Sequence, residues 1–472
     1  MKQGRHRLAG LLAALALVAG SGALVACSEP TPPAAAPSPT HLHSAASPPP
    51  PSTPLRDGER YQQLAMAEPY TPQPTGGGTD EYRCFLVDPG LTSPAYLTGS
   101  QFLPQNPAIV HHAIFFRVPP EQVAEAQALD AEAPGEGWRC FGGTGIGGSG
   151  PGSQLAGGAT WVAAWAPGGG EELTAPGTGY PLAARSRLVM QVHYSLLATD
   201  GKAAGTDRSG IRLRLTDQRA PLTALQTLLL IAPIELACPP GESGNLCDRE
   251  KAVLNLMHRF GPDAGGVVAG LNALCNRGRS PAPAVTQHCD RTVRRAGTVY
   301  AAAGHMHLLG KSIRVELNPG RPGATTLLDV PRYDFDDQGA RPLTPPVAVE
   351  AGDELRVTCT HDATLRRKLP ALRSLEPRYV VWGDGTSDEM CLGVIVWAPT
   401  QKHSCPIGIR RSAPRRVIVE RCLHPYISRS HSTGPGGTRQ PGGNRTRARP
   451  TCSPPPTGST WPVKPRPDCS TS

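Results

Sequence analysis

The chain has 472 residues, of which 39% are hydrophobic, so it can bury a core, and its length predicts two domains. Its formal net charge is +9, but residues 410–472 contain 12 Lys or Arg against 2 acidic residues, a net of +10. The residues before them are therefore close to neutral, which argues against a nucleic-acid enzyme. We predict that residues 406–472 form a disordered basic tail. A cationic patch for anionic lipid or cell wall, or a reading-frame accident, are the alternatives.

The N-terminus has the pattern of an export signal. Lys2, Arg5 and Arg7 precede an apolar run over residues 8–18, and residues 24–27 resemble a bacterial lipobox that ends at Cys27. We predict a signal peptide over residues 1–27, lipidation of Cys27 and a Pro-rich tether over residues 28–58. The protein would then be exported and lipid-anchored on the outer face of the bacterial cytoplasmic membrane or in the periplasm. A membrane helix or a plain secretory signal are the alternatives.

The cysteines also fit an exported protein. Of the 13 cysteines, 12 remain when Cys27 is set aside, an even number that predicts disulfides in an oxidising compartment. Spacing alone does not determine how they pair. The partners remain open for a group of five: Cys238, Cys247, Cys275, Cys289 and Cys405.

Short strands dominate the secondary-structure pattern. Gly- and Pro-rich turns separate apolar or alternating runs, which lie at residues 108–118, 186–197, 312–318, 378–383 and 392–397. Residues 248–260 have helical periodicity instead. The sum predicts an all-β protein of two packed antiparallel sandwiches, with a short helical insertion in the second. We expect the domains to span residues 59–219 and 220–405, the latter following the strand-like run over residues 209–217.

Three histidines in the first predicted domain are candidate metal ligands. His111 and His112 are adjacent, so a regular strand would direct them to opposite faces, and binding one ion requires a bulge or different ring nitrogens. With His193 they make an all-imidazole trio. Gln191, two residues before His193 on the same strand face, could orient a ligand. A buried histidine with an ordinary structural role is the alternative for His193.

The second predicted domain supplies another set. His305 and His307 are two residues apart, which on a strand projects both side chains from one face. Met390 follows a turn rich in Gly, Asp and Ser, where a loop could bring it over the sheet; a core methionine is the alternative. Imidazole suits copper in both common oxidation states and thioether favours Cu(I), so the set indicates copper redox chemistry. A zinc hydrolase and a blue-copper relay fit the pattern less well.

In order, these motifs resemble the copper type II, ascorbate-dependent monooxygenases, which include peptidylglycine alpha-hydroxylating and dopamine beta-monooxygenases. The similarity runs from Tyr82 to Gly393 through "DEYRCF", "HHAIFF", "GWRCF", "QVHY", "GHMHLLGKS" and "SDEMC". It implies two coppers per chain and an ascorbate-like reductant, with the metals facing a solvent-filled cleft between two jelly-roll-like sandwiches. The copper that supplies electrons would be bound by His111, His112 and His193, and the copper that activates dioxygen by His305, His307 and Met390.

The resemblance also implies roles for further residues. Disulfides would join Cys84 to Cys140 and Cys359 to Cys391, while Tyr82 would lie with Gln191 beside the ligands. In the peptide-amidating members an arginine two residues before H-x-H holds the substrate's carboxylate, but here that residue is Ala303, and Leu392 and Val394 replace polar substrate contacts. We therefore expect hydroxylation of a C–H bond in a small organic substrate other than a glycine-extended peptide. The alternative is a non-catalytic copper-binding or electron-relay protein.

Overall fold

The computed structural model describes residues 53–148, 161–217 and 222–400. The predicted signal peptide with Cys27, most of the tether, Cys405 and the basic tail lie outside these residues. Within them the fold is all-β with antiparallel sheets and few helices, as the sequence predicts. None of the described helices is both long enough and apolar enough to cross a membrane. The proposed domain boundary at residues 219 and 220 falls in a gap of the description and stays a prediction.

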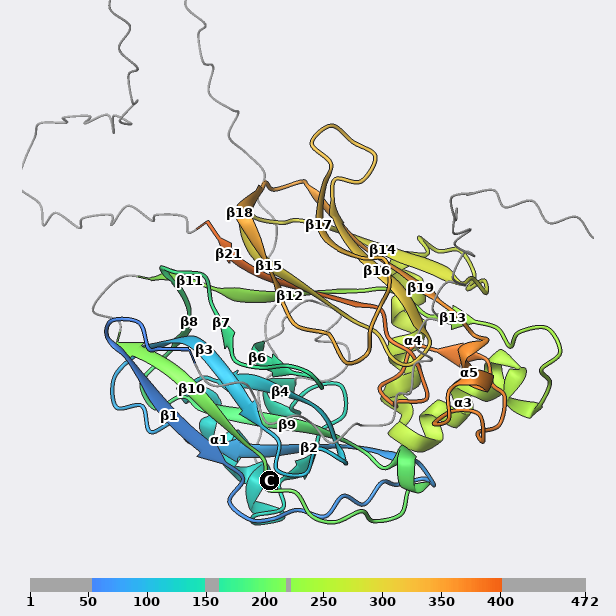
Figure 1. Cartoon of the computed structure of the whole chain (residues 1–472), viewed down its shortest axis with the longest axis horizontal. Coiled ribbons are helices and arrows are strands. Elements are labelled where there is room, and N and C mark those ends of the chain that lie inside the picture. The colour runs from blue at the N-terminus through green and yellow to red at the C-terminus, as the bar shows by residue number, and fades with distance from the viewer. Residues whose placement is uncertain (1–52, 149–160, 218–221, 401–472) are drawn as a thin grey trace, which may run out of the picture. The chain divides into compact units, whose positions relative to one another are not determined.

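Two sheets built from residues 59–224 pack face to face (Figure 1). The first has strand order β1-β10-β3-β8-β11 with β7 beside β3, and the second has order β5-β2-β9-β4-β6. The strands of the first sheet are β1 (Glu59–Ala65), β3 (Ala95–Leu103), β7 (Glu172–Leu173), β8 (Thr178–Leu182), β10 (Gly210–Asp217) and β11 (Thr223–Ala224). Those of the second are β2 (Asp80–Val87), β4 (Val110–Val118), β5 (Trp138–Arg139), β6 (Trp161–Trp165) and β9 (Arg187–Ser195).

The apolar core between these two sheets explains why apolar residues alternate along their strands. Leu97, Phe102, Phe115, Met190 and Leu213 are buried and belong to one cluster drawn from both sheets. Burying such side chains contributes about 1.5–3 kcal/mol each relative to exposure, so this core fixes the register of β4 and β9. These two central strands are the ones that carry the first three candidate ligands.

Residues 226–399 form two further sheets of four strands each and one sheet of two strands. The four-stranded sheets have orders β12-β21-β15-β18 and β14-β19-β16-β17, and β13 pairs with β20. One four-stranded sheet comprises β12 (Gln226–Ile231), β15 (Gly297–His305), β18 (Arg341–Val349) and β21 (Leu392–Pro399). The other comprises β14 (Thr286–Thr292), β16 (Gly310–Leu317), β17 (Thr325–Val330) and β19 (Glu354–His361), while the short pair is β13 (Glu235–Leu236) and β20 (Val380–Val381).

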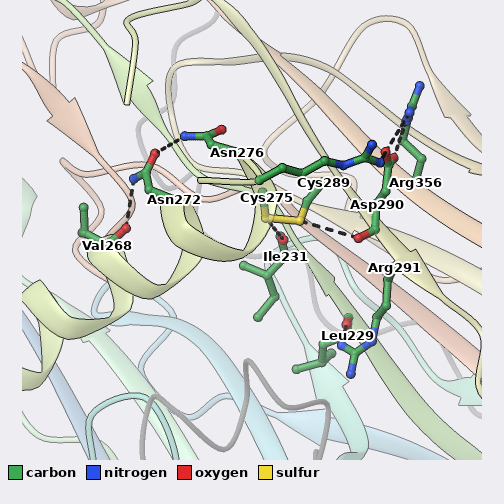
Figure 2. Close-up of a disulfide and its surroundings, with 11 residues drawn as sticks. Leu229, Ile231, Val268, Asn272, Cys275, Asn276, Cys289, Asp290, Arg291 and Arg356 are labelled. Atoms are coloured by element: carbon green, nitrogen blue, oxygen red, sulfur yellow. Dashed lines mark hydrogen bonds and ion pairs between the residues drawn. A yellow bond between two sulfur atoms is a disulfide. The ribbon is translucent and has the colours of Figure 1, made fainter. Parts of the chain in front are cut away.

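The helical insertion is larger than the sequence pattern predicts. The expected helix is α3 (Arg249–Phe260), whose N-cap Asp248 accepts a hydrogen bond from the Lys251 amide. A second helix, α4 (Pro262–Cys275), follows at once and was missed because its Gly- and Ala-rich sequence has little amphipathic pattern. Disulfides Cys238–Cys247 and Cys275–Cys289 bracket the pair, and Figure 2 shows the second of them. Two short helices outside the insertion are α1 (Val123–Ala131) and α5 (Leu365–Lys368).

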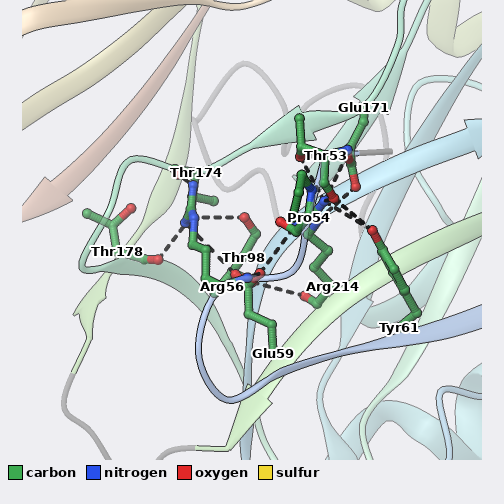
Figure 3. Close-up of polar contacts among 10 residues, drawn as sticks. All are labelled: Thr53, Pro54, Arg56, Glu59, Tyr61, Thr98, Glu171, Thr174, Thr178 and Arg214. Carbon is green, nitrogen blue, oxygen red and sulfur yellow. Dashed lines mark hydrogen bonds and ion pairs between the residues drawn. The ribbon is translucent and has the colours of Figure 1, made fainter. Parts of the chain in front are cut away.

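The last residues of the predicted tether are packed against the first sandwich (Figure 3). The buried guanidinium of Arg214 on β10 forms ion pairs with Glu171 at 2.6 Å and Glu59 at 3.2 Å. It also donates to the carbonyl oxygens of Thr53 and Pro54. Thr53 and Pro54, within the predicted tether, are thus held against the first sandwich, and the predicted bounds of the tether stay a prediction.

Candidate metal centre

The three histidines of the first sandwich converge at the middle of one sheet. A β-bulge between Val110 and His112 breaks the pairing of β4 with β9, so the adjacent His111 and His112 both reach His193. The Nδ1 atom of His112 lies 3.1 Å from that of His111 and 3.3 Å from that of His193. All three residues are buried and each offers a nitrogen within 4.8 Å of the others. The spacing suits an ion bound at about 2 Å from each nitrogen.

Asp80 and Tyr82, both on β2, hold His193 from behind. The Asp80 carboxylate can only accept, so it places the imidazole proton on Nε2 of His193, 3.0 Å away, and Nδ1 of the neutral ring is then the unprotonated nitrogen that can bind a metal. Although burial raises the pKa of Asp80, hydrogen bonds from His193 and Thr386 hold it well below its usual range. The Tyr82 ring stacks on His193 at 4.2 Å, and its hydroxyl donates to the Asp384 carbonyl oxygen at 2.9 Å.

His305 and His307 lie at and just beyond the end of β15. The sequence places both on a strand, but the strand ends at His305 and His307 lies in the following turn. Nδ1 of His305 donates to Gln338 Oε1 at 2.5 Å, and Nδ1 of His307 donates to the Asp388 carbonyl oxygen at 3.3 Å. Each ring therefore keeps Nε2 as its acceptor. For His307 this atom is buried and has no hydrogen-bond partner among the described residues, as expected of a metal ligand.

Glu389 fixes the turn that carries His307. Its fully buried carboxylate accepts from the backbone N–H of His307 at 2.9 Å and of Leu309 at 2.6 Å, and it lies 3.3 Å from Nε2 of His361. Burial raises the pKa of Glu389, but the hydrogen bond and charge of His361, the charge of His307 and the hydrogen bond from the Leu309 amide together lower it below its ordinary value. The carboxylate is thus ionised and orders the backbone on both sides of the H-x-H motif.

Met390 directly follows Glu389, and the next residue, Cys391, forms a disulfide with Cys359 on β19. Met390, His305 and His112 line one cavity of about 650 Å³. Cys84 and Cys140 form the other disulfide that the resemblance implies. Both bridges therefore join residues that flank candidate ligands in the sequence.

The two ligand sets adjoin. The ring centroids of His112 and His305 are 5.6 Å apart, and those of His111 and His307 are 6.2 Å apart. This differs from the solvent-filled separation that the resemblance implies, because imidazoles of the two sets contact each other. Burial, and then the neighbouring His307, lowers the pKa of His305 to about 3, and burial with the other rings lowers the pKa of His112. Neutral imidazoles are the form that binds metals.

Several residues of the site were missed by sequence reasoning. Sequence reasoning assigned no role to Asp80, Gln338 or Glu389, although Asp80 begins "DEYRCF" and Glu389 lies inside "SDEMC", directly before a candidate ligand. Gln191 donates to the carbonyl oxygens of Cys140 at 2.8 Å and Gly143 at 3.2 Å. It thus supports the loop after the Cys84–Cys140 disulfide, and its predicted role beside the histidines stays a prediction.

Comparison with known proteins supports the family. Residues 281–413 match the C-terminal domain of the copper type II ascorbate-dependent monooxygenases, a segment that contains His305, His307 and Met390. This part of the chain is thus similar to that family's C-terminal domain, which supports the family that the motifs indicate. The family implies dependence on copper and ascorbate, and the histidine trio can bind a metal ion. No curated protein matches the chain.

Solved structures add little to this. An allantoicase is 11% identical, with 68% of this chain and 78% of that chain covered and a TM-score of 0.17. The coconut allergen cocosin is 8% identical, with coverage of 72% and 86% and a TM-score of 0.14. The 7S globulin of Momordica charantia is 9% identical, with coverage of 74% and 82% and a TM-score of 0.14. TM-scores this low carry no argument about fold or function.

Proposed function

We propose that the protein is a monooxygenase that binds two copper ions and hydroxylates a C–H bond of a small organic substrate with dioxygen and an ascorbate-like reductant. The observation that carries the proposal is the convergence of five imidazoles, with Met390 on the same cavity as His112 and His305. Nitrogen and thioether donors together suit copper better than zinc or a hard cation. The first ion would be held by His111, His112 and His193, and the second by His305, His307 and Met390.

The residues of the chain prepare these donors. Asp80 keeps a proton on Nε2 of His193, while Gln338 and the Asp388 carbonyl accept the Nδ1 protons of His305 and His307. Each set therefore offers unprotonated nitrogens without a change of tautomer. Copper, when bound, supplies one-electron redox chemistry and activates dioxygen. The protein contributes fixed donors, burial that excludes water, and a cavity for the substrate beside them.

The cavity favours a small, neutral and largely apolar substrate. Ala303, Leu392 and Val394 line it, so the positions that would hold a peptide carboxylate are apolar. Asp384 also lines it, and burial, followed by the charge of Asp388, raises the pKa of Asp384 to about 8. A carboxyl that is mostly neutral at pH 7 supplies no positive charge to pair with the terminal carboxylate of a glycine-extended peptide.

The test is oxygen uptake by copper-loaded protein with ascorbate, across a panel of amines, phenols and aliphatic compounds. We expect uptake coupled to a hydroxylated product for at least one apolar compound, and loss of that coupling in Met390→Ile. The contact of the two histidine sets also suits an electron relay, which is the second candidate. Ascorbate oxidation that never yields a hydroxylated product would favour the relay.

We also propose that the protein is exported and anchored through an acylated Cys27. Supporting this are the charged N-terminus, the apolar run and the lipobox-like residues 24–27. Mass spectrometry of the protein from bacterial membranes should find a diacylglycerol-modified Cys27, and Cys27→Ser should leave the membrane fraction. A mature N-terminus elsewhere would contradict the anchor.

A further inference from the structure

The end of helix α3 lies against the loop that carries the methionine. The guanidinium of Arg259 binds the Asp388 carboxylate through two hydrogen bonds, Nη2 to Oδ1 at 2.6 Å and Nη1 to Oδ2 at 2.9 Å. We infer that Arg259 is a positioning residue for the methionine-containing metal site, so that the helical insertion sets the geometry of that site. The inference deepens the proposed function and rests on it.

Burial and further hydrogen bonds hold the Arg259–Asp388 ion pair in one geometry. The Arg259 and Asp388 side chains are only 10% and 4% exposed, so water competes little for their hydrogen bonds. Nε of Arg259 donates to Asn255 Oδ1 at 3.1 Å, which fixes the guanidinium from its own helix. Arg378 lies 3.8 Å from the same carboxylate. A bidentate pair of planar groups fixes orientation as well as distance, which lysine cannot do.

Asp388 connects this pair to two of the three candidate ligands. Its carbonyl oxygen accepts the Nδ1 proton of His307, and Met390 follows two residues later. Arg366, from the short helix α5, donates to the Ser387 carbonyl oxygen at 3.2 Å, so the loop is also held at the residue before the Arg259 contact. A shift of Asp388 would therefore move the thioether and loosen the hydrogen bond that orients His307.

The loop and helix α3 also fit closely without the ion pair. A Cβ on Gly383 would lie 2.7 Å from Leu256 Cδ1, and a Cβ on Gly385 would lie 2.9 Å from Arg259 Nη1. A larger residue at either position would therefore require the end of the Leu256 or Arg259 side chain to move. The Gly383 contact does not involve the ion pair, so it indicates independently that the loop packs against α3.

Helix α3 is itself held in place. Glu235, fully buried on β13, binds Arg249 at the start of the helix and accepts from Asn272 on α4 at 2.8 Å. At the other end, the Phe260 ring stacks on Phe141, with centroids 5.2 Å apart and planes at 20°. Phe141 follows Cys140 in the first sandwich, so the insertion contacts the regions of both ligand sets.

The experiment compares Arg259→Gln with Arg356→Gln in the full chain loaded with Cu(I). Arg356 on β19 is a matched control because it forms an equally short bidentate pair with Asp290 on β14 (Figure 2). X-ray absorption measures copper-sulfur scattering, and chelator competition measures the affinity of each ion. We expect Arg259→Gln to lose most of the copper-sulfur scattering and to weaken one of two bound ions by about tenfold to hundredfold. The second ion and the Arg356→Gln protein should stay like the wild type.

The outcomes separate the two claims. Wild-type protein without copper-sulfur scattering would refute the methionine-containing site itself, and the inference with it. Wild-type scattering that persists undiminished in folded Arg259→Gln would overturn the inference alone, as would an equal loss in Arg356→Gln. Should Arg259→Gln not fold, Arg259→Lys takes its place, because it keeps the charge but not the bidentate geometry. Scattering and affinity unchanged in the lysine variant would then overturn the inference.

Discussion

Replacing Asp80 tests whether its carboxylate prepares the histidine trio. One oxygen, Oδ1, accepts from His193 Nε2 at 3.0 Å, from the Thr386 amide at 3.0 Å and from the Thr386 hydroxyl at 2.6 Å. Asp80→Asn keeps an oxygen there but removes the charge, so each bond weakens by about 1 kcal/mol and the protein loses about 2–3 kcal/mol of unfolding free energy. Asp80→Ala leaves the N–H donors of His193 and Thr386 buried without this acceptor, while the Thr386 hydroxyl can still donate to Ser195, and we expect a loss of about 3–5 kcal/mol.

The metal should respond as well, because the carboxylate raises the basicity of His193 and fixes its tautomer. We expect Asp80→Asn to weaken Cu(I) binding to the trio by about tenfold, with the methionine-containing site unchanged. Chelator competition gives the affinities, and calorimetry or denaturant unfolding of the metal-free protein gives the stabilities. Wild-type copper affinity in a folded Asp80→Asn protein would refute the reasoning, since the hydrogen bond would then have no influence on the ligand.

In the wild type the pKa of Asp384 is raised to about 8 by folding, so between about pH 4 and 8 the folded protein binds a proton that the unfolded protein does not. The free energy of unfolding of the wild type therefore falls as the pH rises through this range. Asp384→Asn cannot titrate there, so its stability should depend less on pH. Denaturant midpoints across this range would show it, and equal slopes for both proteins would contradict it. Glu389→Gln turns an amide donor toward the backbone N–H of His307 or Leu309. The free energy of unfolding should therefore fall by about 3–5 kcal/mol. A fall below about 1 kcal/mol would exclude the role assigned to Glu389. Arg214→Met leaves Glu59 and Glu171 buried without their cation. Thermal unfolding should show a similar loss of unfolding free energy, with copper affinity unchanged. Altered copper binding would speak against a purely structural role for Arg214.

The sequence predicted the fold class because periodicity carries that information, and local motifs marked the six residues that we propose as metal ligands. Alternation along residues 312–318 gives β16, and of the two alternatives for the adjacent His111 and His112, a bulge or different ring nitrogens, β4 has the bulge. The predicted helix at residues 248–260 is α3. These features depend on residues that are close in the chain, so reading the sequence is enough to find them.

Contacts between distant segments could not be predicted in the same way. Asp80 and Thr386 are 306 positions apart, and nothing near either residue indicates that they meet. The ion pair of Arg259 with Asp388 likewise joins an insertion to a loop 129 residues later. The contact of the two histidine sets depends on how the sandwiches pack, which residue spacing does not encode. These contacts depend on tertiary packing, which the local sequence pattern does not reveal.

The most direct test of the whole account is metal analysis joined to X-ray absorption on the purified, Cu(I)-loaded protein and on Met390→Ile. The account predicts two copper ions per chain, with copper-sulfur scattering in the wild type that disappears in Met390→Ile while copper-nitrogen scattering remains. Fewer than two ions per chain, or copper-sulfur scattering that is absent from the wild type or unchanged by the substitution, would contradict it.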